Sequence, residues 1–313
     1  MTSLALESNE PAPEGVRRVA LAALDDAIAR LGREEVHEAR KRIKELRAIA
    51  RLLGNKKPLG AALRDVAHAL AASRDAEAMI ESFDKLRECF ADEWGKRRFG
   101  KIRRALVNQK ANVDTTSAIT ALRALRPAIE AWNDRDDRFE LFAGGLLKTH
   151  RRSRRAMRAA FTTRAPEQFH EFRKRVKDQW YQLQIIEGAS PEILGGHAQA
   201  LRDLSRVLGD HHDLVVLRGT LRANPVASPR LLRAFDRFVV SRMTELEEEA
   251  DRLGRRALCE KPKAWLRRLR VYWSVWRRES DRRRRGPKRA SRSPLSTDRR
   301  LGTSYRATPS PRR

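Results

Sequence analysis

Two segments of the chain carry the same run of histidine and basic side chains. Residues 36–45 read VHEARKRIKE and residues 169–178 read FHEFRKRVKD. In each copy a histidine is followed at the third, fourth and seventh positions by Arg or Lys, which are intervals that share one face of an α-helix. Cations in such a row can contact successive phosphates of a polyanion through charge-assisted hydrogen bonds.

Each basic face is backed by an apolar one. The basic faces hold His37, Arg40, Lys41, Lys44 and Arg51 in the first copy, and His170, Arg173, Lys174 and Lys177 in the second. The opposite faces hold Val36, Ala39, Ile43, Leu46, Ala50 and Leu53, and Phe169, Phe172, Val176 and Leu183. Like charges one helical turn apart destabilise a helix by a few tenths of a kcal/mol per pair. A sorting that costs free energy and occurs twice favours ligand-binding faces over the alternative, ordinary solvated helices.

A third basic face precedes the second copy. Within residues 145–161 the cations share one helical face and the apolar residues share the other. The candidate ligand contacts on it are Lys148, Arg151, Arg152 and Arg155, followed by Arg158. The counterpart in the first half begins at Arg17 and is much less basic, with Ala22 at the position of Arg155. The basic surface is therefore expected to be biased toward the second half.

These faces must be positioned by helices, since the chain is rich in Ala, Leu, Arg and Glu and has sparse prolines. The two histidine segments are 133 positions apart, and a second repeated element, LRD at residues 63–65 and 201–203, follows at an offset of 138. An internal repeat of this kind predicts an all-α protein of two pseudo-twofold-related helical bundles. We expect a disordered lead over 1–13, one domain over 14–276 with halves 14–107 and 138–276 and a joint at 108–137, and a disordered basic tail over 277–313.

The net charge of the chain restricts the chemical class of its binding partner. The chain has 68 Lys and Arg against 41 Asp and Glu, a net charge of +27, and residues 277–313 hold 14 of those cations against 3 acids. A body this basic predicts a polyanionic partner: a phosphate chain, a nucleic acid or an acidic membrane surface. No apolar run is long enough for a spanning helix, and the N-terminus lacks the pattern of a secretory signal. We therefore expect a cytoplasmic protein that does not insert into membranes.

The sequence offers little that points to catalysis. We find no P-loop, no G-x-S-x-G and no H-E-x-x-H, and the basic faces carry no carboxylate pair to hold a divalent metal. The run Asp210-His211-His212-Asp213 suggests a metal site at first sight. Consecutive residues point to different sides of a helix, however, so one ion cannot collect all four side chains. We expect a binding protein without cofactor or metal, and Cys89 and Cys259 form no metal-binding pair.

The repeated H-E-x-R-K-R-h-K helix, with the downstream LRD and LGDHHDL elements, resembles the CHAD domain, the conserved histidine α-helical domain. The resemblance covers roughly residues 14–275. It implies two four-helix bundles around a pseudo-twofold axis, with a basic central groove that binds inorganic polyphosphate. The ligand-facing residues it implies are His37, Arg40, Lys41, Lys44, His170, Arg173, Lys174 and Lys177, supported by Arg51, Arg151, Arg152 and Arg155.

The resemblance also implies a location and a type. Members of this family are often found at polyphosphate granules, and some are fused to a CYTH triphosphatase domain marked by an E-x-E-x-K strand. This chain lacks that strand, so it is similar to the stand-alone, binding type. The alternative is a basic nucleic-acid-binding helical protein, with the tail as its contact. Aromatic residues, which sequence-tolerant single-strand sites use for base stacking, make up only 6% of the chain and are absent from the first basic face.

Overall fold

The computed structural model describes residues 5–54, 57–70, 72–94, 99–107, 114–132 and 137–285, without the side chains of 57–58, 72–77 and 285. These residues form helices joined by loops, and no strand occurs among them. The predicted all-α class is confirmed. Within the same residues, no helix combines the length and the apolar character needed to cross a bilayer.

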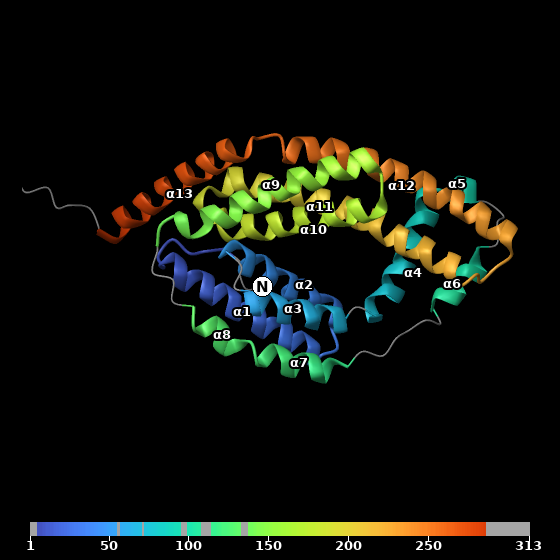
Figure 1. The fold of residues 1–313 in the computed structure, drawn as a ribbon, viewed down its shortest axis with the longest axis horizontal. Coiled ribbons are helices and arrows are strands. Elements are labelled where there is room, and N and C mark those ends of the chain that lie inside the picture. Colours follow the sequence, from blue (N-terminus) through green and yellow to red (C-terminus); the bar gives the residue numbers. More distant parts are fainter. Residues whose placement is uncertain are drawn as a thin grey trace, which may run out of the picture.

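The first half builds one layer of the molecule (Figure 1). It contains α1 (Ala12–Gly32), α2 (Val36–Leu52) and α3 (Lys57–Ala69), which pack in sequence. The outer side of α1 is covered by α7 (Thr115–Arg123) and α8 (Arg126–Glu130), two short helices within the region expected to be a joint. The part of that joint that is described is therefore more regular than predicted, and it completes the first bundle.

The second half builds the other layer, with α13 at its outer edge (Figure 1). Its helices are α9 (Glu140–Thr163), α10 (Pro166–Ile185), α11 (Pro191–Ala223), α12 (Pro229–Ala257) and α13 (Pro262–Arg285). Four of the five begin at a proline, which fits the first helical position because its missing N–H has no helical partner there. Helices α9 to α12 pack each on the next or on α10, and α13 packs on α9.

One segment of the first half lies against the second half. Helix α4 (Ala72–Cys89) packs on α11 and α12, and α5 (Ala91–Trp94) and α6 (Gly100–Val107) pack on α4. Phe83 of α4 stacks on Phe235 of α12 with ring centroids 5.5 Å apart, and Trp94 meets Phe83 edge-on at 5.6 Å. Helices α3 and α4 together span the same length as the unbroken α11. The break between α3 and α4 is therefore a structural difference between the two repeats.

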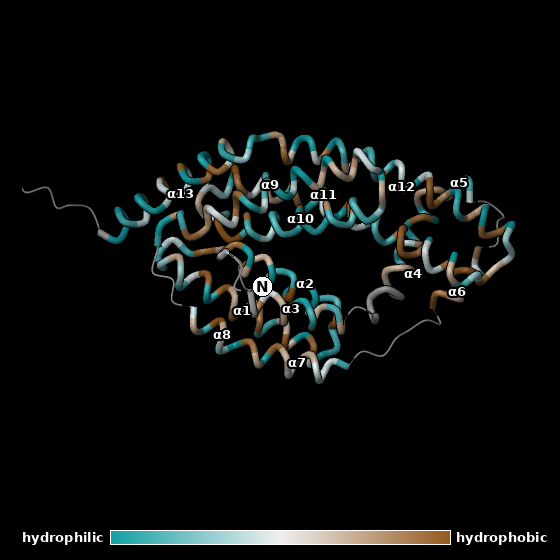
Figure 2. Tube along the Cα trace, viewed as in Figure 1, coloured by the Kyte–Doolittle hydropathy of each residue, from teal (hydrophilic) through white to brown (hydrophobic). Residues whose placement is uncertain are grey.

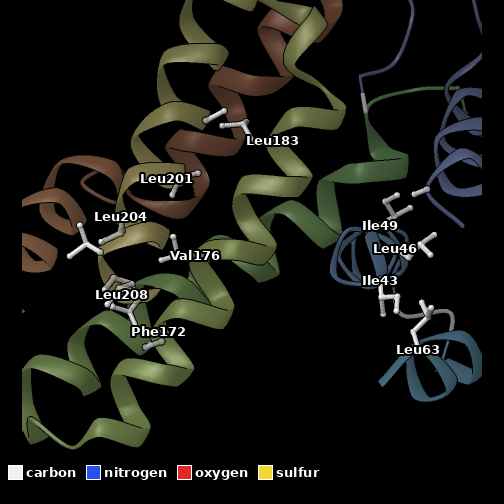
Figure 3. Close-up of a cluster of buried hydrophobic side chains, with 14 of the residues drawn as sticks. Ile43, Leu46, Ile49, Leu63, Phe172, Val176, Leu183, Leu201, Leu204 and Leu208 are labelled. Carbon is white, nitrogen blue, oxygen red and sulfur yellow. The ribbon is translucent and has the colours of Figure 1, made fainter. Parts of the chain in front are cut away.

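The apolar faces predicted from the repeat are buried, except that Val36 and Leu53 at the two ends of α2 are only partly buried. Figure 3 shows them as two groups, one on α2 and α3 and one on α10 and α11. Ile43 and Leu46, like Phe172 and Val176, are fully enclosed. Ile49 and Leu52 are buried as well, although they were not on the predicted stripe, because α2 also contacts α10 and α9. Figure 2 shows hydrophilic residues along both α2 and α10 beside these apolar positions.

Two boundaries differ from the sequence-based prediction. Helix α1 begins at Ala12, and Leu6, in the expected lead, is buried and donates its backbone N–H to the Ile185 carbonyl at 2.9 Å. Helix α13 continues to Arg285, past the predicted start of the tail, because Trp273 packs on Phe142 and Arg277 donates to the Glu10 carbonyl. The tail that remains, residues 286–313, lies outside the described residues, as do residues 1–4, 108–113 and 133–136.

Candidate functional site

A basic cavity of about 540 Å³ lies where the two repeated helices, α2 and α10, meet. Its described wall also includes residues of α3, α4 and α11. The cations and histidines of the wall are Arg40, Lys44, Arg47, Arg51, Arg64, His68, His170, Arg173, Lys174, Arg175, Lys177 and His212. Asp178 and Asp213 are the carboxylates among the described wall residues. The site therefore concentrates positive charge contributed by both halves.

Seven of the residues predicted from sequence are part of this wall. They are Arg40, Lys44 and Arg51 from α2, and His170, Arg173, Lys174 and Lys177 from α10. Four of them form two pairs that the repeat relates: Arg40 with Arg173, and Lys44 with Lys177. The two copies of the motif thus face a common space, as a pseudo-twofold arrangement requires.

The other predicted residues lie outside the described wall. His37 is half exposed near the start of α2, and Lys41 donates to Glu38 at 2.5 Å one turn back. Their equivalents on α10 do line the cavity, so the two copies are not used alike. The four cations of the third basic face, Lys148, Arg151, Arg152 and Arg155, lie on the exposed side of α9 and not on the described wall.

Several wall residues were not among the sequence candidates. Arg47 lies at the edge of the first basic face, and Arg64 belongs to the repeated LRD element, so both carried a usable signal. His68 and His212 come from α3 and α11, at positions that only the packing of the helices brings to the site. Arg175 and Tyr181 complete the α10 side of the wall.

Buried carboxylates tie the two repeated helices together. Asp178 of α10 accepts a hydrogen bond from Arg51 of α2 at 2.6 Å. Within each helix the equivalent acid pairs with a preceding arginine: Arg42 donates to Glu45 at 2.7 Å, and Arg175 to Asp178 at 3.4 Å. Burial raises the pKa of the Asp178 and Glu45 carboxyls, and the adjacent guanidinium groups oppose that shift. The acids that flank each basic face thus hold the cations in place and reduce their mutual repulsion.

Two arginines of the wall are positioned by the neighbouring helices. Arg40 donates from Nη1 to the Ala67 carbonyl of α3 at 3.0 Å. Arg173 lies against Gly209 of α11, where an added Cβ would come within 3.1 Å of its guanidinium. A residue larger than glycine would push the Arg173 side chain away. Both guanidinium groups are therefore oriented before any ligand arrives, which lowers the entropy lost on binding.

His170 is poised for a change of charge. Its ring lies 4.0 Å, centroid to centroid, from that of His212, and its buried Nδ1 has no hydrogen-bond partner among the described residues. Burial, with Lys174 and Arg173 nearby, lowers the pKa of His170 to about 4. The imidazole is therefore neutral at physiological pH, and a bound polyanion would favour its protonated form.

Arg47, like His170, has a buried nitrogen at the cavity wall that the described residues leave without a hydrogen bond. Its Nε is buried and lacks a hydrogen-bond partner within the described chain. Burial and the proximity of Arg51 lower the pKa of the Arg47 guanidinium. Buried donors are normally satisfied, and an anionic oxygen in the cavity would satisfy this one.

The acidic histidine run on α11 does not gather around one point. Asp210 pairs with Lys85 at 3.0 Å, His211 is buried beside Glu247 of α12 at 3.2 Å, and His212 faces His170. The described residues contain no group of three His, Cys, Asp or Glu side chains arranged to hold a metal ion. The separation of these side chains follows from helical geometry, as expected.

Comparison with known proteins gives one result that fits this arrangement. No curated protein and no solved structure matches the chain. The model of the CHAD domain family matches residues 16–222, from the first turns of α1 to the end of α11, which includes both copies of the histidine motif and every helix that contributes to the cavity wall. Two thirds of the chain is covered, and the protein therefore belongs to the CHAD domain family.

Proposed function

We propose that this protein binds inorganic polyphosphate in the cavity between α2 and α10. The observation that carries the proposal is the concentration of cations from both repeats on one wall, with two carboxylates among the described lining residues and Asp178 already paired to Arg51. A linear phosphate chain has the charge density and the oxygen acceptors that such a wall requires. It also lacks bases, for which the described wall offers no Phe or Trp, and its Tyr181 is buried.

The protein acts in this proposal as a binding or targeting protein associated with polyphosphate granules, and not as an enzyme. A phosphoryl-transfer site uses carboxylates to place a divalent metal. Here Asp178 is held by Arg51 and Arg175. Incubation of the purified protein with polyphosphate and Mg²⁺ should release no phosphate, and metal-dependent release would contradict this part of the proposal.

The binding test compares the full chain with the variant Lys44→Gln/Lys177→Gln. These two lysines occupy equivalent positions and both line the cavity. Binding of labelled polyphosphate should weaken by roughly a hundredfold, because a hydrogen bond to a charged group contributes about 1.5–3 kcal/mol. It should also fall steeply with salt through counterion release. Unchanged binding by the variant would reject the cavity as the site.

Nucleic acid remains the competing partner, through the basic tail. A chain ending at Arg285 keeps α13 complete and removes residues 286–313. If the tail is the nucleic-acid contact, this truncation should lose DNA and RNA binding and keep polyphosphate binding. The competing result is a truncated chain that binds DNA as tightly as polyphosphate, with both affinities lost in the lysine variant. That result would show that the cavity binds nucleic acid.

A further inference from the structure

The exposed face of α9 carries a row of cations that the cavity does not use. The α9 strip, as we call it, consists of Lys148, Arg151, Arg152, Arg155 and Arg158. It is about 15 Å long at 1.5 Å per residue. In the described part of the chain, none of the five has an ion-pair or hydrogen-bond partner. Exposed arginines elsewhere are paired, as Arg164 is with Glu247 and Arg255 with Asp251.

The repeat shows that this strip is a property of the second half alone. Subtracting the offset of 133 gives the equivalent positions on α1, which are Gly15, Arg18, Val19, Ala22 and Asp25. Gly15 and Val19 are buried, Arg18 pairs with Glu10, and Asp25 pairs with Arg126 of α8. The N-terminal segment covers that side of α1 at Gly15 and Arg18, through Leu6 and Glu10, and α8 contacts it at Asp25. In the second half α13 packs on the other side of α9, where Trp265 stacks on His150, and leaves the strip bare.

Among the described residues, no acidic side chain pairs with the strip to relieve the repulsion between its cations. Neighbouring members are three or four residues apart, a spacing at which like charges destabilise a helix. The exposed positions of α9 include no aromatic side chain on which a base could stack. A row of cations on a rigid, convex helix suits a flexible chain of phosphates that carries no bases.

We propose that the α9 strip is a second contact for the same long polyphosphate chain that occupies the cavity, so that binding strength depends on chain length. This inference rests on the proposed function. A chain held in the cavity is present at high effective concentration near other cations of the same molecule, and a second contact then raises affinity without a second independent binding event. Short oligophosphates fill the cavity and do not reach the strip.

The experiment uses the full chain with two probes, tripolyphosphate and polyphosphate of several hundred residues, each titrated at fixed salt. The strip variant is Arg151→Gln/Arg155→Gln. The matched control is Arg233→Gln/Arg237→Gln, which removes two exposed cations at the same spacing on α12. The strip variant should bind the long chain roughly tenfold more weakly, a modest part of the 10²–10⁴-fold that linked contacts can provide. Its affinity for tripolyphosphate, and both affinities of the control, should stay unchanged.

Three results would overturn the inference: equal losses in the strip and control variants, no loss of long-chain affinity in the strip variant, or a loss confined to a duplex DNA probe. A melting temperature equal to that of the original chain shows that the strip variant is folded. The variant Lys44→Gln/Lys177→Gln reports separately on the cavity. If it keeps both polyphosphate affinities, the proposed function fails, whatever the strip variant does.

Discussion

Arg51 of α2 and Asp178 of α10 form an ion pair, 2.6 Å from Nη1 to Oδ1, that joins the two halves at the wall of the basic cavity. Asp178 is buried, whereas Arg51 keeps about a quarter of its side chain exposed, 27%. The same carboxylate also accepts from Arg175 at 3.4 Å. One buried acid thus balances cations from both repeats, and it does so at the place where a polyanion is proposed to bind.

Replacing Asp178 should change the stability of the fold and its affinity for polyphosphate in opposite directions. Asp178→Asn leaves Arg51 without its counter-charge, whereas Arg175 keeps its pair with Glu171. The substitution should lower the free energy of unfolding by about 3 kcal/mol, the lower end for a broken buried pair because Arg51 is partly exposed. The same change raises the positive potential of the cavity, so polyphosphate affinity should increase. Denaturant unfolding and calorimetric titration measure the two effects. A variant that is less stable and also binds more weakly would contradict this balance.

Equivalent lysines of the two repeats should behave differently. Lys174 lines the cavity and Lys41 does not, although each pairs with the glutamate three residues before it, at 2.8 Å and 2.5 Å respectively. Lys174→Gln should weaken polyphosphate binding roughly tenfold, the equivalent of about 1.4 kcal/mol. Lys41→Gln is the matched control and should change binding little. Equal losses would mean that the ligand contacts both motifs symmetrically.

The difference between Lys41 and Lys174 could not be predicted from the sequence. Helical period alone identified both motif helices, their apolar faces and seven cavity residues, because these depend only on local spacing. Lys41 and Lys174 have nearly the same neighbours along the chain, so nothing local distinguishes them. What distinguishes them is the packing: α11 is continuous beside His170, whereas its counterpart is divided into α3 and α4, and α4 packs on the other half. The covered outer side of α1 and the bare side of α9 likewise depend on tertiary contacts.

Binding should take up protons near neutral and mildly acidic pH. The pKa of His170 is about 4, below the ordinary value of 6.5. The charged groups near it are Lys174, Arg173, Glu171 and Lys44 of α2, and the His212 ring lies against it. A polyanion raises that pKa, so affinity should increase as pH falls from about 7 toward 5. Calorimetry in buffers of different ionisation enthalpy measures the protons taken up. His170→Gln should reduce that number.

The lowered pKa of His170 also affects the stability of the unliganded protein, which should decrease as pH falls, whereas polyphosphate affinity should increase. Because the folded-state pKa of His170 is lower than the unfolded one, the unfolded chain binds more protons between pH 6.5 and 4. This contribution to stability is fully present above pH 6.5 and is lost as pH falls through that window. The lowered pKa values of His150, His197 and His211 act in the same direction. Polyphosphate should therefore protect the protein most strongly against acid.

The crossing of α2 and α9 can be tested at two adjacent glycines. An added Cβ at Gly145 would overlap the backbone carbonyl of Leu52, at the end of α2, whereas one at Gly144 would meet nothing within 4 Å. Gly145→Ala should destabilise the fold, since the overlapped atom is backbone and cannot rotate away. Gly144→Ala should stabilise it by about 0.5–1 kcal/mol through helix propensity. Thermal unfolding compares them, and equal effects would place the two helices farther apart.

The docking of α4 onto the second half also sets the order in which the chain can fold during synthesis. Met79, Phe83 and Leu86 of α4 are buried in the finished protein, and Phe83 rests on Phe235, some 150 residues downstream. Until the ribosome has released α11 and α12, these side chains have only first-half helices such as α5 and α6 to pack on and remain partly open to aggregation. The docking of α4 is therefore a late step of folding, and a ribosome that stalls before α12 releases a product that cannot complete the burial of α4.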